Sequence, residues 1–307
     1  MNSFNIRKGL LITNGFLRTD KFVEHYEWLK EAGTSYGIRL EMMGNDEKLF
    51  FCGDDLSWLD RYSFILFWDK DIRLGKQIWQ YAKKKQILMF NSIESIGICD
   101  DKFETYHRIH EWNREHSGKK IELLPTIMAP MTYENIGYTN LDFLAEIEEK
   151  MSYPMVIKEC FGSFGAQVYL VQNRKELEEL TRKLAGVPFF YQKFHAYSKG
   201  RDVRLQVVGE QVVAGMYRFS ENGDFRANIT NGGRMKAYEP TEREAGLAVK
   251  AAKILGLDFA GVDLLFSETG ADILCEVNSN AHFKNIYTCT GVNVADCIMK
   301  YISGRLD

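Results

Sequence analysis

The sequence predicts a small α/β domain with a parallel sheet, followed by a longer α+β region. Over residues 9–92, short apolar runs typical of strands alternate with amphipathic runs typical of helices, the pattern of parallel strands joined by right-handed crossovers. From residue 153 onward, strand-like runs follow one another across glycine-containing turns, as antiparallel strands do. The 307 residues are enough for two or three domains with a sizeable core.

The first domain is expected to contain four strands and two helices. The strands are predicted at residues 9–15, 38–43, 62–71 and 87–92, and the helices at 21–33 and 74–85. Ligands of open parallel sheets gather at the carboxyl ends of the strands. In this chain those ends carry the sequences WDKD and FNS, at residues 68–71 and 90–92.

The following region is expected to mix helices with antiparallel strands. Helices are predicted at about 101–117, 141–150, 175–186 and 240–257, and strands at both ends of 153–171 and at 189–194, 260–267 and 272–278. Residues 202–219 alternate in polarity around Gly209-Glu210, which predicts a hairpin with a two-residue turn. Thr241 followed by Glu244 predicts a capping box at the start of the last helix.

Charge and cysteine usage narrow the class of protein. The formal net charge of −3 favours neither nucleic acid nor an anionic membrane as a partner. No segment approaches the roughly 18 apolar residues of a membrane span, and the first apolar stretch is too short for a secretory signal. The six cysteines are scattered without a CxxC pair, which is typical of free thiols that pack as small hydrophobic groups. We therefore expect a reduced, cytoplasmic protein.

Three oxygen-bearing side chains stand on the last two predicted strands. Glu276 and Asn278 are two residues apart, so they project from the same face of one strand. The short turn ETGA makes the strand of Asp263 its neighbour, which brings Asp263 within reach of that face. Two carboxylates held together repel each other unless a cation lies between them, and magnesium prefers all-oxygen ligands of this kind. The alternative is a pair of solvated strand ends.

A lysine and a glycine loop form a second candidate site. Lys158 ends an apolar strand and is soon followed by the loop GSFG, residues 162–165. Glycine lets successive N–H groups close over phosphate oxygens beside such a charge. The segment matches neither the P-loop nor the Rossmann pattern, and the motif alone favours a plain glycine hairpin.

Polar residues along and after the predicted hairpin form a third candidate site. Arginines that alternate on a strand are often only a solvated face, but these residues directly precede the carboxylates in sequence. Guanidinium groups facing a magnesium site suit a polyphosphate. The set consists of Arg201, Asp202, Arg204, Arg218, Arg226 and Asn228.

The order of these motifs resembles the ATP-grasp superfamily, and most closely its RimK-type ligases, the ribosomal-protein glutamate ligase group. The resemblance covers nearly the whole chain and is strongest over KGRDVRLQVVGEQVVAGMYR, GDFRANITNGG and LDFAGVDLLF, continuing through CEVN to TGVNVADCIMKYI. It implies an ATP-grasp fold in three parts. These are a pre-ATP-grasp α/β domain at 1–98, a central subdomain with a glycine-rich lid loop at 99–190, and a C-terminal subdomain with the magnesium site at 191–307.

The resemblance also implies roles for individual residues. The nucleotide phosphates would be contacted by Lys102 and Lys158, under a lid formed by Gly162, Ser163, Phe164 and Gly165. The adenine would lie against the hinge backbone of Gln192, Lys193 and Phe194, and the ribose beside Asp202. The residues near the transferred phosphate and acyl substrate would be Arg218, Arg226 and Asn228, and the magnesium ligands would be Asp263, Glu276 and Asn278.

The reaction that the resemblance implies is phosphorylation of a carboxylate by ATP, followed by attack of an amine on the acyl phosphate to give an amide and ADP. Phosphoryl transfer requires mainly positioning and charge neutralisation, which agrees with the charged residues above. The implied cofactors are ATP and Mg²⁺, with Mn²⁺ as an alternative metal. The implied partners are an amino acid or other carboxylate, with glutamate as the default, and an amine or peptide acceptor. Related proteins often form homo-oligomers.

Two other functions stay open at this stage. A kinase on the same scaffold would stop at a phosphate ester, and a nucleotide-binding protein would show no turnover. The chain also departs from the family pattern at two places. Lys193 stands where the hinge usually carries an acidic residue, and residues 279–283, SNAHF, replace the usual small-Pro-Gly loop near the substrate. His282 in that loop either contacts the substrate or packs the loop, and packing is the favoured alternative.

Overall fold

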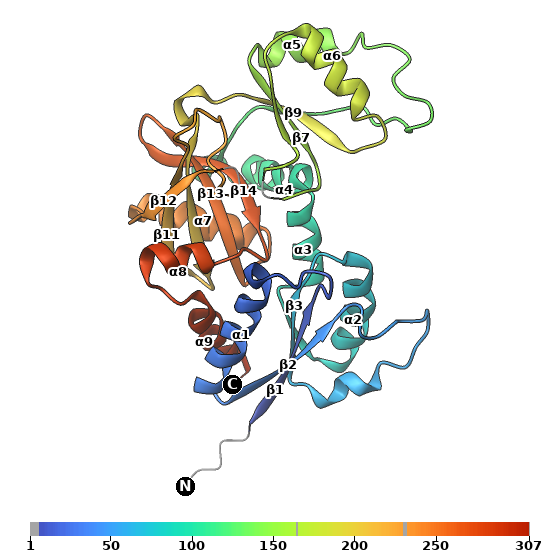
Figure 1. The fold of residues 1–307 in the computed structure, drawn as a ribbon, viewed down its shortest axis with the longest axis vertical. Coiled ribbons are helices and arrows are strands. Elements are labelled where there is room, and N and C mark those ends of the chain that lie inside the picture. Colours follow the sequence, from blue (N-terminus) through green and yellow to red (C-terminus); the bar gives the residue numbers. More distant parts are fainter. Residues whose placement is uncertain (1–5, 164, 230–231, 307) are drawn as a thin grey trace.

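The computed structural model describes residues 6–163, 165–229 and 232–306, and there the strands form three sheets (Figure 1). The first sheet is parallel, as predicted, and its strands follow the order β2-β1-β3-β4. Its strands are β1 (Arg7–Thr13), β2 (Ile38–Gly44), β3 (Phe64–Trp68) and β4 (Leu88–Phe90). The helices that follow β1 and β3 are α1 (Asp20–Ser35) and α2 (Ile72–Lys85), and a short 3-10 helix, η1 (Ser57–Arg61), precedes β3.

The central strands β1 and β3 are buried over residues 9–13 and 64–68 because both of their faces are covered. Leu11 packs in one hydrophobic cluster with Leu29 of α1, whereas Leu10 belongs to a second cluster with Ile78 of α2. Alternating residues of β1 therefore contact helices on opposite faces of the sheet. This explains why the hydrophobic run is continuous, whereas a strand with one exposed face would alternate between apolar and polar residues.

The second sheet has six strands in the order β12-β11-β10-β13-β14-β5. It is antiparallel except that β5 pairs in parallel with β14. The strands are β5 (Glu122–Leu123), β10 (Arg201–Val208), β11 (Gln211–Phe219), β12 (Arg234–Ala237), β13 (Phe259–Ser267) and β14 (Gly270–Asn278). The predicted hairpin is confirmed, since β10 and β11 are joined through Gly209-Glu210 alone.

One face of the six-stranded sheet is covered by α7 (Glu242–Ile254), which packs on β10, β13 and β14 together with α4 (Lys102–Glu115). The predicted capping box is present at the start of α7. The Glu244 N–H donates to Thr241 Oγ1 at 3.3 Å, and the Thr241 N–H donates to Glu244 Oε2 at 2.8 Å. Part of the opposite face packs against the N-terminal domain, since Val208, Ala214 and Met216 share a hydrophobic cluster with Leu11, and the rest carries the polar side chains of the candidate site.

The third sheet belongs to a module inserted between β5 and β10, which lies at the top of the view in Figure 1. Its antiparallel strands follow the order β6-β9-β7-β8. They are β6 (Thr126–Met128), β7 (Met155–Glu159), β8 (Val168–Val171) and β9 (Phe189–Lys193), accompanied by α5 (Leu144–Met151) and α6 (Arg174–Lys183). We call residues 126–193 the lid module.

The remaining elements connect these units. They are α3 (Ile93–Asp100), α8 (Lys284–Thr290), α9 (Val294–Leu306), η2 (Ser117–Lys119) and η3 (Ala196–Ser198). In Figure 1, α9 lies beside α1 below the six-stranded sheet, and one hydrophobic cluster joins Leu29 of α1 to Ile298 of α9 and Phe259 of β13. The N-terminal domain is therefore packed against the six-stranded sheet by a shared core. Among the described residues, no helix has the length and hydropathy of a membrane span.

A single buried amide reinforces this packing. Asn91, directly after β4, is fully buried, and its Nδ2 donates to the carbonyls of Phe259 and Ser279, each at 2.9 Å. Its Oδ1 accepts from the N–H groups of Asp258 and Phe259 at 2.7 and 3.2 Å. The sequence FNS was expected at a ligand-gathering edge, but in the structure the side chain of Asn91 is committed to joining two domains.

Substitution of Asn91 by Ala should destabilise the protein strongly. It would leave two backbone carbonyls and two N–H groups buried without the amide, and we expect the free energy of unfolding to fall by about 2–4 kcal/mol. Urea denaturation followed by circular dichroism measures this change. Asn173→Ala, at the exposed N-cap of α6, is the control and should cost only about 1 kcal/mol. Equal losses in the two variants would contradict a docking role for Asn91.

Candidate active site

A cleft lies between the lid module and the open face of the six-stranded sheet. Nearly all of the side chains that the sequence singled out line it together. These are Lys102, Lys158, Gly162, Ser163, Gly165, Gln192, Lys193, Phe194, Asp202, Arg218, Arg226, Asn228, Asp263 and Glu276. Phe164 lies outside the described residues, and Asn278 stands beyond the cleft lining, next to Gly261 in the strand register.

The expected metal ligands share one face of the sheet. Asp263 and Glu276 are directly opposed across β13 and β14, and Asn278 follows Glu276 at the spacing of one face. The register shifts after Asp263, where Cys275 is the extra residue of β14. Such a bulge turns a side chain that would otherwise point away, and Cys275 lines the cleft beside Glu276.

Asp263 is held by two arginines. Arg204 is its cross-strand neighbour and donates through Nε and NH2 to the two carboxylate oxygens at 2.6 and 2.7 Å. Arg218 NH2 lies 2.9 Å from Asp263 Oδ2, and Arg218 also forms a bidentate pair with Asp202 at 2.6 and 2.8 Å. The four side chains form one charged network in which Asp202, Arg218 and Asp263 are buried.

Burial and charge act in opposite directions on these groups. Burial raises the pKa of Asp202 above its ordinary value, although the guanidinium of Arg218 opposes the shift. At Asp263 burial also favours the neutral acid, but Arg204 and Arg218 together hold the pKa below its ordinary value. Asp263 is therefore a carboxylate in the folded protein, which is the form that a cation or a guanidinium requires.

The residues fit a hard divalent ion. Among the described residues, Glu276 has one charged partner, Lys102, at 3.9 Å, so its carboxylate oxygens are available to a cation. The described residues contain no cluster of three or more His, Cys, Asp or Glu side chains that could hold a metal. Two carboxylates and an amide would therefore be the protein ligands, leaving the other positions to phosphate oxygens and water, as is usual for magnesium.

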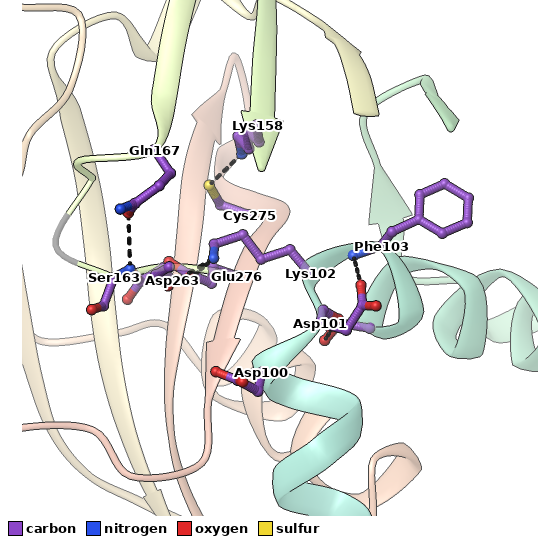
Figure 2. Close-up of polar contacts among 12 residues, drawn as sticks. Asp100, Asp101, Lys102, Phe103, Lys158, Ser163, Gln167, Asp263, Cys275 and Glu276 are labelled. Carbon is purple, nitrogen blue, oxygen red and sulfur yellow. Dashed lines mark hydrogen bonds and ion pairs between the residues drawn. The ribbon is translucent and has the colours of Figure 1, made fainter. Parts of the chain in front are cut away.

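Two lysines lie beside β14, one against Glu276 and the other against Cys275 (Figure 2). Lys102, at the start of α4, donates to the Gly162 carbonyl at 2.9 Å and points at Glu276. Burial lowers the pKa of Lys102, and the negative charge of Glu276 opposes that shift. Lys158, at the end of β7, lies 3.9 Å from Cys275 Sγ. Burial raises the pKa of the Cys275 thiol to about 11, so it is not a nucleophilic thiolate at neutral pH.

The glycine loop follows β7 and comes down over the cleft. Gly162 has φ +132°, and a Cβ on it would lie 2.4 Å from Gln167 Oε1, so the turn requires glycine. The Ser163 N–H donates to the same Gln167 oxygen at 3.3 Å (Figure 2). At the other end of the loop, Arg226 NH1 donates to the Gly165 carbonyl at 2.9 Å. The loop is thus tied to Lys102 on one side and to Arg226 on the other.

The predicted hinge residues end β9. Gln192 is buried and donates to Thr126 Oγ1 at 2.9 Å, while the Lys193 N–H donates to the Pro125 carbonyl at 3.0 Å. The Lys193 N–H is therefore not free to read a base. The cleft here is lined by apolar side chains that suit an aromatic ring, namely Val156, Phe190, Leu124 and Leu265.

The loop that departs from the family pattern packs against the N-terminal domain. Asn280 Nδ2 donates to the Asp69 carbonyl at 3.0 Å. The His282 ring lies edge-on to Phe22 and His25, with centroids 4.8 and 4.7 Å apart, which agrees with the packing alternative. Asp69 itself is buried, accepts from Asn14 and Asn45, and has a pKa raised by burial.

Sequence reasoning did not anticipate several contacts in and around the cleft. Arg204 was part of the arginine set, but its direct hold on Asp263 depends on the strand register between β10 and β13. Cys275 reaches the cleft only because of the bulge in β14. Tyr106 lines the cleft as well and donates to the carbonyls of Leu274 and Cys275 at 3.1 Å. In the sequence, Tyr106 is only one residue on the apolar face of a predicted helix, and nothing there indicates that it lines the cleft.

Replacement of Lys102 by Met should weaken binding of a phosphate-bearing ligand. One charge-assisted contact is worth about 1.5–3 kcal/mol, so we expect the Kd for an ATP analogue to rise about 10- to 100-fold. Isothermal titration calorimetry of both proteins measures this. Lys250→Met, on the exposed surface where Lys250 contacts the Lys119 carbonyl, is the matched control. Equal affinities in the Lys102 variant and the control would remove Lys102 from the phosphate site.

Comparison with known proteins agrees with this geometry. The family profile described as RimK-like ATP-grasp domain matches residues 120–302. Human N-acetylaspartylglutamate synthase A is 29% identical over 230 residues, which are 75% of this chain and 56% of that protein. Human beta-citrylglutamate synthase B is 30% identical over 230 residues, with the same 75% and 56% coverage. The chain thus spans about half the length of these curated relatives.

The fold is shared over the whole length with solved structures of low sequence identity. The ATP-grasp ligase PsnB, solved with a phosphomimetic variant of its minimal precursor, Mg and ADP, superposes with a TM-score of 0.64 at 13% identity. The superposition covers 98% of this chain and 99% of that chain. It includes the N-terminal sheet, the lid module and the six-stranded sheet.

Proposed function

Because the chain belongs to the RimK-like ATP-grasp family, we propose that it is an ATP- and magnesium-dependent ligase that joins a carboxylic acid to an amine. The observation that carries the proposal is the meeting of Asp263 and Glu276 across two strands, directly beneath Lys102 and the glycine loop. Cations, acidic residues and a backbone loop surround one cleft, as transfer of a phosphoryl group requires.

The reaction has two steps. An oxygen of the substrate carboxylate attacks the terminal phosphorus of ATP, and ADP leaves. The amine nitrogen then attacks the carbonyl carbon of the acyl phosphate, inorganic phosphate leaves, and the nitrogen loses a proton. Both steps pass through concentrated negative charge, so the cleft must neutralise charge and hold the reactants in place.

The residues of the cleft divide that work. Lys102 and Lys158 contact the phosphates, and the loop of residues 162–165 excludes water above them. Arg218 and Arg226, with Asn228, face the transferred phosphate and the acyl group from the side of the six-stranded sheet. Asp263, Glu276 and Asn278 would hold the divalent ion, which when bound would supply positive charge to the phosphates. Mg²⁺ is the expected ion, and Mn²⁺ is an alternative.

Several contacts of the free protein must be exchanged when the nucleotide binds. Lys102 and Arg226 bond to carbonyls of the loop, and phosphate oxygens are stronger acceptors than carbonyls for a charged donor. Asp202 accepts from Arg218 through both oxygens, so a ribose contact would have to share or replace that pair. We also propose that the chain divides into three parts, with boundaries at residues 98 and 190.

We propose glutamate as the amine and a small polar carboxylic acid as the group that is activated. The names of the two human relatives support this, since N-acetylaspartylglutamate and beta-citrylglutamate both contain glutamate joined to such an acid. A peptide acceptor is the alternative that the precursor complex of PsnB suggests.

The test is release of ADP in the presence of ATP, Mg²⁺, glutamate and a panel of carboxylic acids, with the product identified by mass spectrometry. An amide with stoichiometric free phosphate supports the ligase. A phosphate ester without an amide would show a kinase instead, and binding of ATP without ADP release across the panel would show a protein that binds nucleotide without turnover.

A further inference from the structure

One buried side chain on the site face has no role in the network described so far. Gln206 of β10 is fully buried, and neither its Oε1 nor its Nε2 has a hydrogen-bond partner in the part of the chain that the structure describes. A buried amide left unsatisfied costs stability, because its lost hydrogen bonds to water are not replaced. Most buried polar groups are satisfied by protein or water, so this glutamine points to a ligand.

Gln206 lies on the same face of the sheet as the charged network. It follows Asp202 and Arg204 at the two-residue spacing of β10. Its neighbour on β13 is Gly261, and a Cβ on Gly261 would lie 3.5 Å from Gln206 Oε1 and 3.6 Å from Arg204 Cδ. The amide therefore turns toward the row that carries the metal ligands and away from α7.

A second unsatisfied amide flanks the same glycine. Asn278 is opposed to Gly261 on the other side, and its Nδ2 is buried without a partner among the described residues. Ala281 covers Gly261 so closely that an added Cβ would lie 2.5 Å from its own Cβ. Gln206 and Asn278 thus stand on either side of a residue without a side chain, beneath the loop of residues 279–283.

The position along the strand identifies which reactant this pair would meet. The cleft that suits the base and phosphates is lined by Asp202 but not by Gln206. Gln206 is four residues beyond Asp202, about 13 Å, and two residues beyond Arg204, about 7 Å, along an extended strand. A ligand group beside Gln206 is therefore on the far side of Asp263 and Glu276 from the nucleotide.

We infer that Gln206, with Asn278, binds the distal polar group of the carboxylic acid that the enzyme activates, an inference that rests on the proposed function. The reacting carboxylate must lie at the transferred phosphate, beside Asp263 and Glu276. A second carboxylate or an amide about 7 Å away along β10 meets the glutamine. An amide offers both a donor and an acceptor, and Arg204 adds positive charge next to it. The substrate class is a short acid with a polar group at its far end.

The experiment compares wild type with Gln206→Met, which keeps the length of the side chain and removes the amide. ADP release is measured with glutamate as the amine and with four acids in turn: citrate, N-acetylaspartate, glutarate and pentanoate. Glutarate and pentanoate have the same chain length, and only glutarate carries a second carboxylate. We expect the KM of the preferred polar acid to rise about tenfold or more, since one buried hydrogen bond is lost. We expect the KM values for ATP and glutamate to change less than twofold, and the preference for glutarate over pentanoate to fall by the same factor.

Thermal stability provides a second readout. Because the amide has no partner in the described residues of the free protein, Gln206→Met should keep or raise the Tm. The matched control is Asn113→Leu, which removes a buried amide that is fully bonded to Ile121 at 2.8 Å in both directions. That variant should lose Tm and keep the wild-type KM for the acid.

The outcomes separate this inference from the proposed function. If wild type releases no ADP with any acid of the panel, the ligase proposal fails, and the inference fails with it. If wild type is active and Gln206→Met keeps both the acid KM and the preference for glutarate, the inference alone is overturned. A rise in the acid KM accompanied by the same Tm loss as the control would also overturn it, because the amide would then be structural.

Discussion

Glu276→Gln should abolish magnesium-dependent turnover while leaving the fold intact. The substitution keeps the shape of the side chain and removes one of two opposed negative charges that would hold the ion. We expect kcat to fall about 1,000-fold or more, the scale seen when a charge-stabilising group is removed from a preorganised site. The magnesium concentration for half-maximal rate should rise in parallel. Initial rates of ADP release over a series of magnesium concentrations measure both effects.

The stability of this variant should be close to that of wild type. The only charged partner of Glu276 among the described residues is Lys102, at a distance of 3.9 Å, too long for a strong hydrogen bond. Glu210→Gln, in the exposed hairpin turn where the residue pairs with Lys253, serves as the control for a generic loss of charge. A wild-type response to magnesium in Glu276→Gln would falsify the metal assignment.

Arg218→Met should have the largest effect on stability of any substitution considered. Arg218 is 4% exposed, and its guanidinium bonds to both Asp202 and Asp263. Its removal leaves two buried carboxylates with Arg204 as their remaining close cation in the network. We expect the free energy of unfolding to fall by about 3–5 kcal/mol, as when one partner of a buried ion pair is deleted. Urea denaturation monitored by tryptophan fluorescence measures the change.

The loss in Arg218→Met should shrink as the pH falls. Without the guanidinium, burial raises the pKa of Asp202 further above its unfolded value, so the folded variant binds more protons than the unfolded chain. The free energy of unfolding of such a protein increases as the pH decreases. Asp202→Asn added to the variant should restore part of the loss at neutral pH. A pH-independent deficit, or no rescue by Asp202→Asn, would show that the network is not electrostatic in origin.

A surface arginine provides the comparison for this experiment. Arg234 lies on β12, next to the strand of Arg218, and forms an ion pair with Glu221 in which both side chains are more than half exposed. Exposed pairs contribute little, so Arg234→Met should change stability by about 0.5 kcal/mol or less.

The sequence predicted those elements whose signals are local. The alternation of strand-like and helix-like runs predicted the first parallel sheet, and the polar alternation around Gly209-Glu210 predicted the hairpin. The capping box of Thr241 and Glu244 fixed the start of α7. Each of these depends on residues that are near one another in the chain, where backbone preferences and burial act together.

Elements set by distant pairing were not predicted. β5 has only two residues, and it is a strand because β14 offers it a free edge. β6 and β12 are similarly short and depend on β9 and β11. Asn91 reads in the sequence as the end of a parallel strand, and only the folded chain reveals that its amide joins two domains. Such roles depend on contacts between segments that are well separated in the chain, which no local pattern encodes.

The candidate site shows the same division. The residue types and their order predicted the cleft, and the structure brings nearly all of them together. The pairing of Arg204 and Arg218 with Asp263 required the register of three strands, and the unsatisfied amide of Gln206 required knowledge of burial. In the sequence, Gln206 is only one polar residue in an alternating hairpin.

The chain enters the lid module at Thr126 and leaves it at Lys193, and these two crossings are hydrogen-bonded neighbours through the Lys193 N–H and the Pro125 carbonyl. If the lid module rotates relative to the six-stranded sheet, the rotation axis therefore passes through these two neighbouring crossings. The residues proposed to contact the base, 192–194, lie beside this axis and would move little. Glu159 pairs with Phe189, four residues of β9 away from Lys193, so the glycine loop beyond it has a lever arm of at least about 13 Å. A nucleotide would be anchored at its ring while its phosphate end is alternately exposed and covered.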